Sequence, residues 1–210
     1  MRMVKRIART SVFLGIMMLI FSQNVIGQED PQGMMKSLTD KVMNALRTNR
    51  EALKSNPGKI YSLVDTIIIP HADFAEMGRW VVGRNAWQAS SDALKQEFIK
   101  EFKTLVVRTY ASALLGYTDQ TVEFLPLRGG AGGERVQVSS LVRQAGKKPL
   151  RLDYRLIKQG GNWKLYDIII EGISIVQGYR AQFANDARSG GLQAVIDKIR
   201  IHNRGRGGKK

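Results

Sequence analysis

Hydrophobic side chains follow a helical period in the first half of this 210-residue chain, a period of two in the middle, and a helical period again at the end. Between residues 34 and 46, and between residues 60 and 68, they recur every three or four positions, which is typical of amphipathic helices. Between residues 121 and 170 they alternate with polar residues, which is typical of β-strands. The sequence therefore predicts helices, then a sheet, then helices, which is an α+β fold.

The segment just before the sheet is predicted to be helical. Residues 71–87 mix aromatic, aliphatic and arginine side chains, and we predict short helices there, broken at Gly78 and Gly83. Ser90-Ser91-Asp92 is an N-cap signal for the longest helix, which runs from Asp92 to Leu115. A helix of that length spans about 36 Å at about 1.5 Å per residue. We therefore expect it to lie across the whole sheet.

Short turns join the strands that are predicted in the middle of the chain. Residues 128–134 are a glycine-rich turn, and Gln159-Gly160-Gly161-Asn162 is a tight hairpin connection. A strand follows the glycine-rich turn, so it lacks the helix and lysine of a phosphate-binding loop. Consecutive strands with short connections predict a four-stranded antiparallel meander, covered by the N-terminal and C-terminal helices: Thr121–Leu125, Arg135–Val142, Leu150–Ile157 and Trp163–Ile170.

The last predicted strand is apolar on both faces. Strict alternation places Asp167 on the same face as Trp163, Leu165 and Ile169, and Tyr166 on the opposite face. A strand of this kind lies inside a sheet and is covered on both sides.

After Glu171-Gly172 the chain is predicted to close with two helices. Ser174 caps the first helix, and Gly190-Gly191 ends it. Leu192, Val195, Ile196 and Ile199 form the apolar stripe of the second. Residues 202–210 are basic and glycine-rich, and we predict a disordered tail there.

The first 27 residues have the features of a secretory signal peptide. Four basic residues precede an apolar run at residues 11–21, and Val25 and Gly27 supply the small residues of a cleavage site. The apolar run is about half as long as a membrane-spanning helix, which needs about 20 residues. We therefore predict export to a bacterial periplasm and a single mature domain, residues 28–201, with a helical part (33–116), a sheet (120–171) and closing helices (173–201).

Composition narrows the range of partners and chemistry. The absence of cysteine excludes disulfides and thiolate metal sites. The formal charge is +15, and the signal peptide holds four of these charges and no acidic residue, so the mature chain carries +11. A basic protein can attract nucleic acid, anionic lipid or acidic protein surfaces. Because the chain is exported, we predict no nucleic-acid partner, and we expect a monomer.

Catalytic groups are scarce in this sequence. The two histidines, His71 and His202, do not have the spacing of metal ligands, and no Gly-x-Ser-x-Gly motif supplies a nucleophile. We therefore predict no metal site, no cofactor and no enzymatic activity. Asp167 leaves one alternative open, because a carboxylate among apolar side chains can serve as a base, as in the ketosteroid isomerases. The other interpretation is an aspartate that caps a helix or pairs with an arginine.

Two segments resemble a known family. Residues 166–176, Tyr-Asp-Ile-Ile-Ile-Glu-Gly-Ile-Ser-Ile-Val, followed by Tyr179-Arg180 and Phe183, resemble the signature of the MlaC family. Residues 82–87, Val-Gly-Arg-Asn-Ala-Trp, the spacing of Phe98 and Phe102, and residues 109–114 resemble an earlier block of the same family. The resemblance runs from about Met34 to Ile199, so the basic end lies outside it.

MlaC proteins, also called toluene-tolerance proteins, are periplasmic phospholipid carriers. The resemblance implies an NTF2-like curved sheet joined to a helical part, with the acyl chains of the lipid held between them. It implies neither a cofactor nor turnover. The partners that it implies are phospholipid, an outer-membrane lipoprotein complex and the inner-membrane MCE-domain subunit of an ABC transporter.

A lipid-carrying function makes the apolar faces of the sheet and helices candidate contacts for acyl chains. Arg84 and Arg180 are candidate neighbours of the headgroup, which stays near water because burial of a phosphate is costly. The same apolar residues also suit an ordinary close-packed core, and sequence does not distinguish the two. An NTF2-like enzyme with Asp167 as base and a ligand-free adaptor protein remain alternatives. The candidate acyl-chain contacts are Phe98, Phe102, Leu105, Tyr110, Val122, Phe124, Val136, Val138, Leu152, Tyr154, Tyr166, Val176 and Tyr179.

Overall fold

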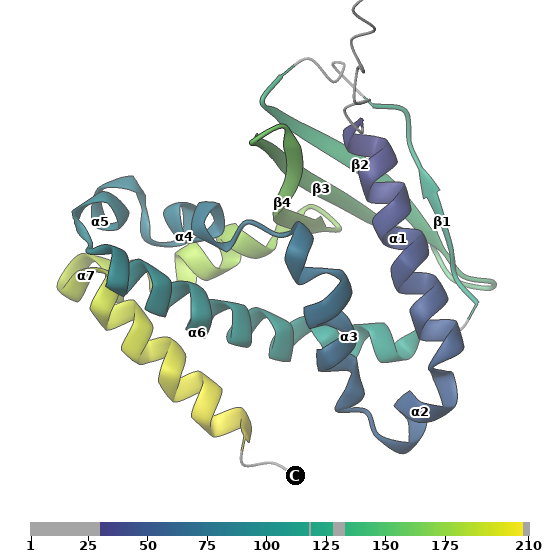
Figure 1. Cartoon of the computed structure of the whole chain (residues 1–210), viewed down its shortest axis with the longest axis horizontal. Coiled ribbons are helices and arrows are strands. Elements are labelled where there is room, and N and C mark those ends of the chain that lie inside the picture. The colour runs from purple at the N-terminus through teal and green to yellow at the C-terminus, as the bar shows by residue number, and fades with distance from the viewer. Residues whose placement is uncertain (1–29, 118, 128–132, 208–210) are drawn as a thin grey trace, which may run out of the picture.

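A computed structural model describes residues 30–117, 119–127 and 133–207 of the chain (Figure 1). The predicted signal peptide and most of the glycine-rich turn, residues 128–132, lie outside the described residues. Within those ranges, no helix combines the length and the apolar composition needed to cross a membrane.

Helices precede and follow the sheet, as the hydrophobic pattern predicts. The helices before it are α1 (Pro31–Thr48), α2 (Arg50–Ser55), α3 (Lys59–Ile67), the 3-10 helix η1 (Ile69–His71), α4 (Phe74–Val82), α5 (Arg84–Ala89), α6 (Asp92–Tyr110) and the 3-10 helix η2 (Ala111–Gly116). The strands are β1 (Thr121–Phe124), β2 (Arg135–Arg143), β3 (Leu150–Gln159), β4 (Asn162–Ile170) and β5 (Ile173–Ser174), and the last helix is α7 (Ile175–Gly207).

The described strands form one antiparallel sheet in the order β1-β2-β3-β4-β5, which confirms the α+β fold and the meander. The short strand β5 is an addition to the four predicted strands. Gly160 and Gly161 connect β3 to β4 with φ angles of 54° and 86°. This left-handed backbone suits glycine and closes a tight hairpin. β4 lies inside the sheet between β3 and β5, and among the described residues only the short β5 and an isolated bridge from Ala72 pair with its outer edge.

A bulge in β4 changes which residues share a face. Leu156 of β3 lies opposite Leu165, but the preceding Arg155 lies opposite Asp167, so Tyr166 is an extra residue in the ladder. Ile168 therefore joins Leu165 on one face, and Asp167 lies on the other. The prediction that Asp167 shares a face with Trp163 and Leu165 is wrong, because counting in steps of two does not detect an inserted residue.

Helix α1 covers the apolar face of the sheet, which we call the inner face (Figure 1). Met34, Met35 and Leu38 are buried in one cluster with residues of β2, β3 and β4. The expectation that the helix beginning at Asp92 lies across the sheet is wrong, because α6 packs against α4 and α7, which also contact each other. Helix α6 also ends at Tyr110, and its last predicted turns form the 3-10 helix η2.

The second large cluster lies among α4, α5, α6 and α7, and we call it the helical core. Gly83 has φ of 88° and separates α4 from α5, as predicted. Gly78 does not break α4, because it lies inside the helix under the rings of Trp87 and Phe98. A glycine at this position permits close approach of the rings, which a sequence pattern does not distinguish from a helix break.

Helix α7 begins where the sequence predicts, and a kink divides it at Gly190-Gly191, where the first of the two predicted helices ends. The Ser174 hydroxyl accepts a hydrogen bond from the Gln177 amide at 3.0 Å, which is the predicted cap. Non-helical angles at Gly190 and Gly191 kink the helix. The prediction of a disordered tail is wrong for residues 202–207, which continue α7. The buried Asn203 side chain donates to the Glu101 carbonyl at 3.1 Å and so fastens this end to α6.

Candidate functional site

The structure divides the candidate acyl-chain contacts between the two clusters. Val122, on β1, belongs to neither of these two clusters. It lies two residues from Phe124 on the same strand and pairs with Val142 of β2. The sheet residues line the inner face under α1: Phe124, Val136, Val138, Leu152 and Tyr154. The others belong to the helical core: Phe98, Phe102, Leu105, Tyr110, Tyr166, Val176 and Tyr179.

The helical core is filled rather than hollow at its centre. Phe98 and Phe102 have no exposed surface, and their ring centroids lie 5.2 Å apart. Tyr179 packs edge-on against Phe102, with centroids 5.1 Å apart. Since a side chain without accessible surface borders no space large enough for water, these two phenylalanines line no open cavity in this structure.

The inner face of the sheet is less completely covered. Val122, Phe124, Val136 and Leu152 are only partly buried, although all four are apolar. Tyr154 stacks near Phe124, with centroids 6.3 Å apart, and its hydroxyl lies 3.2 Å from the Ser140 hydroxyl. Burial raises the pKa of Tyr154, so the hydroxyl is neutral at physiological pH. The face therefore combines apolar side chains with a neutral polar pair, which suits an apolar ligand.

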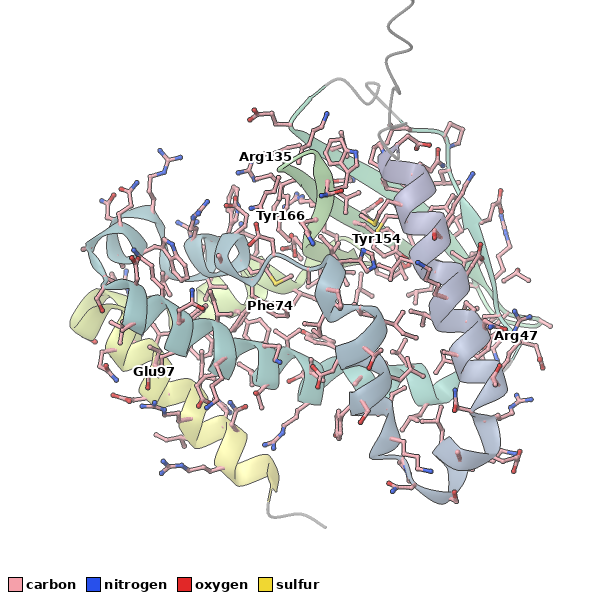
Figure 2. All side chains as sticks on the ribbon, in the orientation of Figure 1. Arg47, Phe74, Glu97, Arg135, Tyr154 and Tyr166 are labelled. Atoms are coloured by element: carbon pink, nitrogen blue, oxygen red, sulfur yellow. The ribbon has the colours of Figure 1, made fainter. Side chains whose placement is uncertain are left out.

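Arg84 and Arg180, the two predicted headgroup neighbours, line the same open cleft. We call it the cationic cleft; its volume is about 660 Å³. It lies between α4, α5, α6, α7 and the first residue of β2. Arg135 and Tyr166 lie at the end of the sheet nearer α4, whereas Tyr154 lies toward α1 (Figure 2). The charged and aromatic residues lining the cleft are Glu76, Arg79, Trp80, Arg84, Trp87, Lys95, Arg135 and Arg180.

Glu76 joins the helices to the sheet at the bottom of this cleft. Its buried carboxylate accepts from Arg135 at 2.6 Å, from Arg79 at 2.9 Å and from the Trp80 indole at 3.0 Å. Burial acts to raise the pKa of Glu76, but the hydrogen bonds and charges of Arg135, Trp80 and Arg79 outweigh it and hold the pKa below its ordinary value of 4.5. Spacing along α4 is compatible with the Arg79 and Trp80 contacts, but no sequence signal indicates Arg135, which lies 59 positions away.

We expect Glu76→Gln to lower the free energy of unfolding by about 1 kcal/mol at neutral pH, because both arginines are half exposed. A carboxyl with a lowered pKa in the folded state stabilises above pH 4.5 and loses this contribution as pH falls through the folded value. The wild type should therefore lose more stability than Glu76→Gln on acidification below pH 4.5. Urea unfolding at several pH values measures this, and parallel profiles for the two proteins would contradict it.

The contacts of Asp167 stabilise the fold. Its carboxylate accepts from the Ser174 hydroxyl at 2.6 Å, from the Val176 amide at 3.1 Å and from Arg155 at 3.3 Å. These contacts cap α7 and pair one charge on the outer face of the sheet, which is the second of the two interpretations that the sequence leaves open.

We expect Asp167→Asn to lower the free energy of unfolding by about 1–2 kcal/mol, because it weakens a helix cap and removes a charge pair. Lipid content should be unchanged, since Asp167 does not lie on the inner face. Thermal melts and lipid analysis test both statements, with Asp119→Asn, an exposed position, as the matched control. A fully stable Asp167→Asn protein that has lost its ligand would instead support a direct role in the site.

Metal chemistry has no structural support in the part of the chain that the structure describes. There, no group of three or more histidine, aspartate or glutamate side chains could hold a metal ion.

Comparisons with known proteins give a consistent result. The model of the family described as MlaC protein matches residues 36–200. Toluene tolerance protein ttg2D of Pseudomonas putida is 26% identical over 184 residues, which are 87% of this chain and 85% of that protein. The intermembrane phospholipid transport system binding protein MlaC of Haemophilus influenzae is 22% identical over 183 residues, 86% of this chain and 85% of that protein. A solved phospholipid-binding protein from Ralstonia solanacearum, in complex with a phospholipid, is 33% identical with a TM-score of 0.77, over 85% of this chain and 99% of that chain.

Proposed function

This chain belongs to the MlaC family, and on that premise we propose that it is a phospholipid carrier that shields acyl chains from water while it moves lipid between membranes. A chain of about 16 carbons costs about 13 kcal/mol when it is exposed to water, at about 0.8 kcal/mol per CH₂. Two such chains cross an aqueous compartment only when a protein surface replaces the bilayer interior. The function therefore requires apolar surface that the protein itself leaves uncovered.

The incompletely covered inner face is the observation that carries this proposal. Val122, Phe124, Val136 and Leu152 present partly exposed apolar surface beside α1. We place the acyl chains between α1 and this face, with Val138 and Tyr154 beneath them. We place no acyl chain in the helical core, because Phe98 and Phe102 are already enclosed by other side chains.

The cationic cleft is our proposed location for the headgroup. β2 connects the two surfaces at its first residues, because Val136 packs in the inner-face cluster and Arg135 lines the cleft. A lipid at this end of the sheet can bury its tails on one side while its phosphate meets Arg84 and Arg180 in water. Burial of the phosphate is thereby avoided, which removes a large desolvation cost.

The cellular setting is part of the proposal. Residues 1–27 direct export, and the mature domain acts in the periplasm as a monomer without a cofactor. Its partners are an outer-membrane lipoprotein complex and the inner-membrane MCE-domain subunit of an ABC transporter. The net positive charge of the mature chain raises the rate of encounter with acidic partner surfaces.

We expect protein purified from bacterial cells to carry phospholipid. Native mass spectrometry should show a mass above that of the mature chain, and organic extraction should return the protein to the mass of the polypeptide. Lipid analysis of the extract identifies the class and number of acyl chains. Identical masses before and after extraction would contradict the carrier function and favour a ligand-free adaptor.

A further inference from the structure

Positive charge dominates the cationic cleft. Arg79, Arg84, Lys95, Arg135 and Arg180 line it together with the single carboxylate of Glu76, which gives a formal charge of +4. Like charges gathered around one opening repel each other and attract an anion. The cleft is also open to solvent, so an anion can enter it without losing all of its hydration.

Two of the five cations form no ion pair with any residue that the structure describes. Arg79 and Arg135 share Glu76, and Lys95 pairs with Asp92 at 3.0 Å. Within the described ranges, neither Arg84 nor Arg180 forms an ion pair. They come from different helices, α5 and α7, and line the same opening. Two guanidinium groups that form no ion pair and line a common cleft are available to an oxyanion that enters it.

Two tryptophans, Trp80 and Trp87, line the cleft beside these charges. Trp80 stacks on Tyr166 with centroids 6.4 Å apart, and the Arg135 guanidinium lies 5.2 Å from the centre of the Tyr166 ring. The indole donates to Glu76, which fixes the orientation of the ring. The cleft therefore offers an apolar surface next to the cations, which suits an amphiphile better than a bare ion.

We propose that the cationic cleft binds the phosphate group of an acidic lipid, and that Arg84 and Arg180 make this carrier prefer headgroups with a net negative charge over zwitterionic ones. The inference rests on the proposed carrier function and adds the class of headgroup to it. A zwitterionic headgroup brings an ammonium group into a site that already holds five cations, and repulsion offsets the attraction of its phosphate. A glycerol headgroup brings no such charge.

Competition between two lipids with identical acyl chains tests this preference. The purified mature protein is incubated with vesicles of equal parts phosphatidylglycerol and phosphatidylcholine, re-isolated, and its bound lipid is analysed by mass spectrometry. We expect the bound ratio of phosphatidylglycerol to phosphatidylcholine to fall about tenfold in Arg84→Gln/Arg180→Gln, since each exposed ion pair contributes up to about fivefold. Screening should reduce the wild-type ratio at about 1 M salt.

Two control variants distinguish the effect of the charges in the cleft from an effect on folding. Lys36→Gln/Arg47→Gln removes the same charge from exposed positions on α1, a helix that does not line the cleft, and should keep the wild-type ratio (Arg47 is labelled in Figure 2). Arg84→Lys/Arg180→Lys keeps both charges and should retain most of the preference. Because Arg84 and Arg180 have no ion-pair partners to lose, thermal melts of all variants should match the wild type.

Competition with inorganic phosphate distinguishes a site for a lipid headgroup from a site for free phosphate. If the headgroup occupies the cleft, phosphate added at constant ionic strength should lower the wild-type lipid ratio. Equal lipid ratios in the wild type and Arg84→Gln/Arg180→Gln, with phosphate binding seen by ³¹P NMR only in the wild type, would overturn the headgroup assignment and indicate a free-phosphate site. Equal ratios without any phosphate binding would overturn the anion site itself. Failure of the wild type to take up either lipid would overturn the carrier function, while the phosphate measurement would still decide whether the anion site exists.

Discussion

Gly78→Ala is expected to lower the free energy of unfolding by about 1–3 kcal/mol, the usual cost of adding a methyl group to a filled core. Gly178→Ala is expected to raise it by about 0.5–1 kcal/mol, because alanine favours helix over glycine by that amount. The same chemical change in two helices of one protein should therefore act in opposite directions.

Packing explains the difference in sign. A Cβ atom at position 78 lies 2.8 Å from Cη2 of Trp87 and 2.9 Å from Cε1 of Phe98, closer than carbon atoms approach in folded proteins. Neither ring can move aside easily, because they pack edge-on with centroids 5.7 Å apart and both are buried. Position 178 is exposed on α7, and a Cβ atom there meets nothing within 4 Å.

Urea unfolding of the two variants and the wild type, followed by tryptophan fluorescence, measures both effects. Trp87 lies in the perturbed region, so its emission in the folded state should also change in Gly78→Ala. Destabilisation of both variants by the same amount would show that backbone conformation rather than ring packing explains the glycine at position 78.

The elements of this fold follow from its hydrophobic pattern, but their mutual arrangement does not. Period and caps predict most helices and strands within a few residues, because they depend on local chemistry that the chain displays in order. The place of α6 depends instead on which partner its apolar stripe meets. Phe98 and Phe102 would suit a sheet or a helix pair equally well, and only the structure shows that α4 and α7 cover them.

The bulge at Tyr166 changes the face of the sheet on which Asp167 lies, and with it the function that this residue could have. Alternation assigns Asp167 to the apolar face and so makes a buried base conceivable. The inserted residue moves Asp167 to the outer face, where Arg155 and the start of α7 occupy its carboxylate. Nothing in the local sequence marks the insertion, because Tyr166 suits a regular strand as well as a bulge.

The sequence predicts two of the residues that line the cationic cleft but not the others. Arg84 and Arg180 are predicted together as headgroup neighbours, and both line it. Glu76 and Arg135 complete its lining although they lie 59 positions apart in the sequence, and the Tyr166 ring packs against Arg135. Such pairs follow from the tertiary arrangement, which a single sequence does not display.

Phe124→Glu is expected to weaken phospholipid binding by about 100-fold, because a charged side chain among hydrocarbon costs about 2.5–3.5 kcal/mol. Phe124 lies on the inner face, only partly buried, where we place the acyl chains. The carboxylate can remain hydrated in the empty protein because this position is not fully enclosed. It must lose water when a lipid tail arrives, so the penalty falls mainly on the bound state.

Thr121→Glu is the matched control for this change. Thr121 lies on the same strand, is exposed, and pairs with Arg143 of β2. A glutamate there adds the same charge, but its carboxylate stays hydrated and lies near an arginine. Phe124→Leu keeps the position apolar and should retain most of the binding. Lipid uptake from vesicles, measured beside a thermal melt for each variant, separates lost binding from lost folding. If Phe124→Glu stays folded and takes up lipid as well as Thr121→Glu does, the acyl chains do not lie on the inner face of the sheet, and the partly exposed apolar residues there need another explanation.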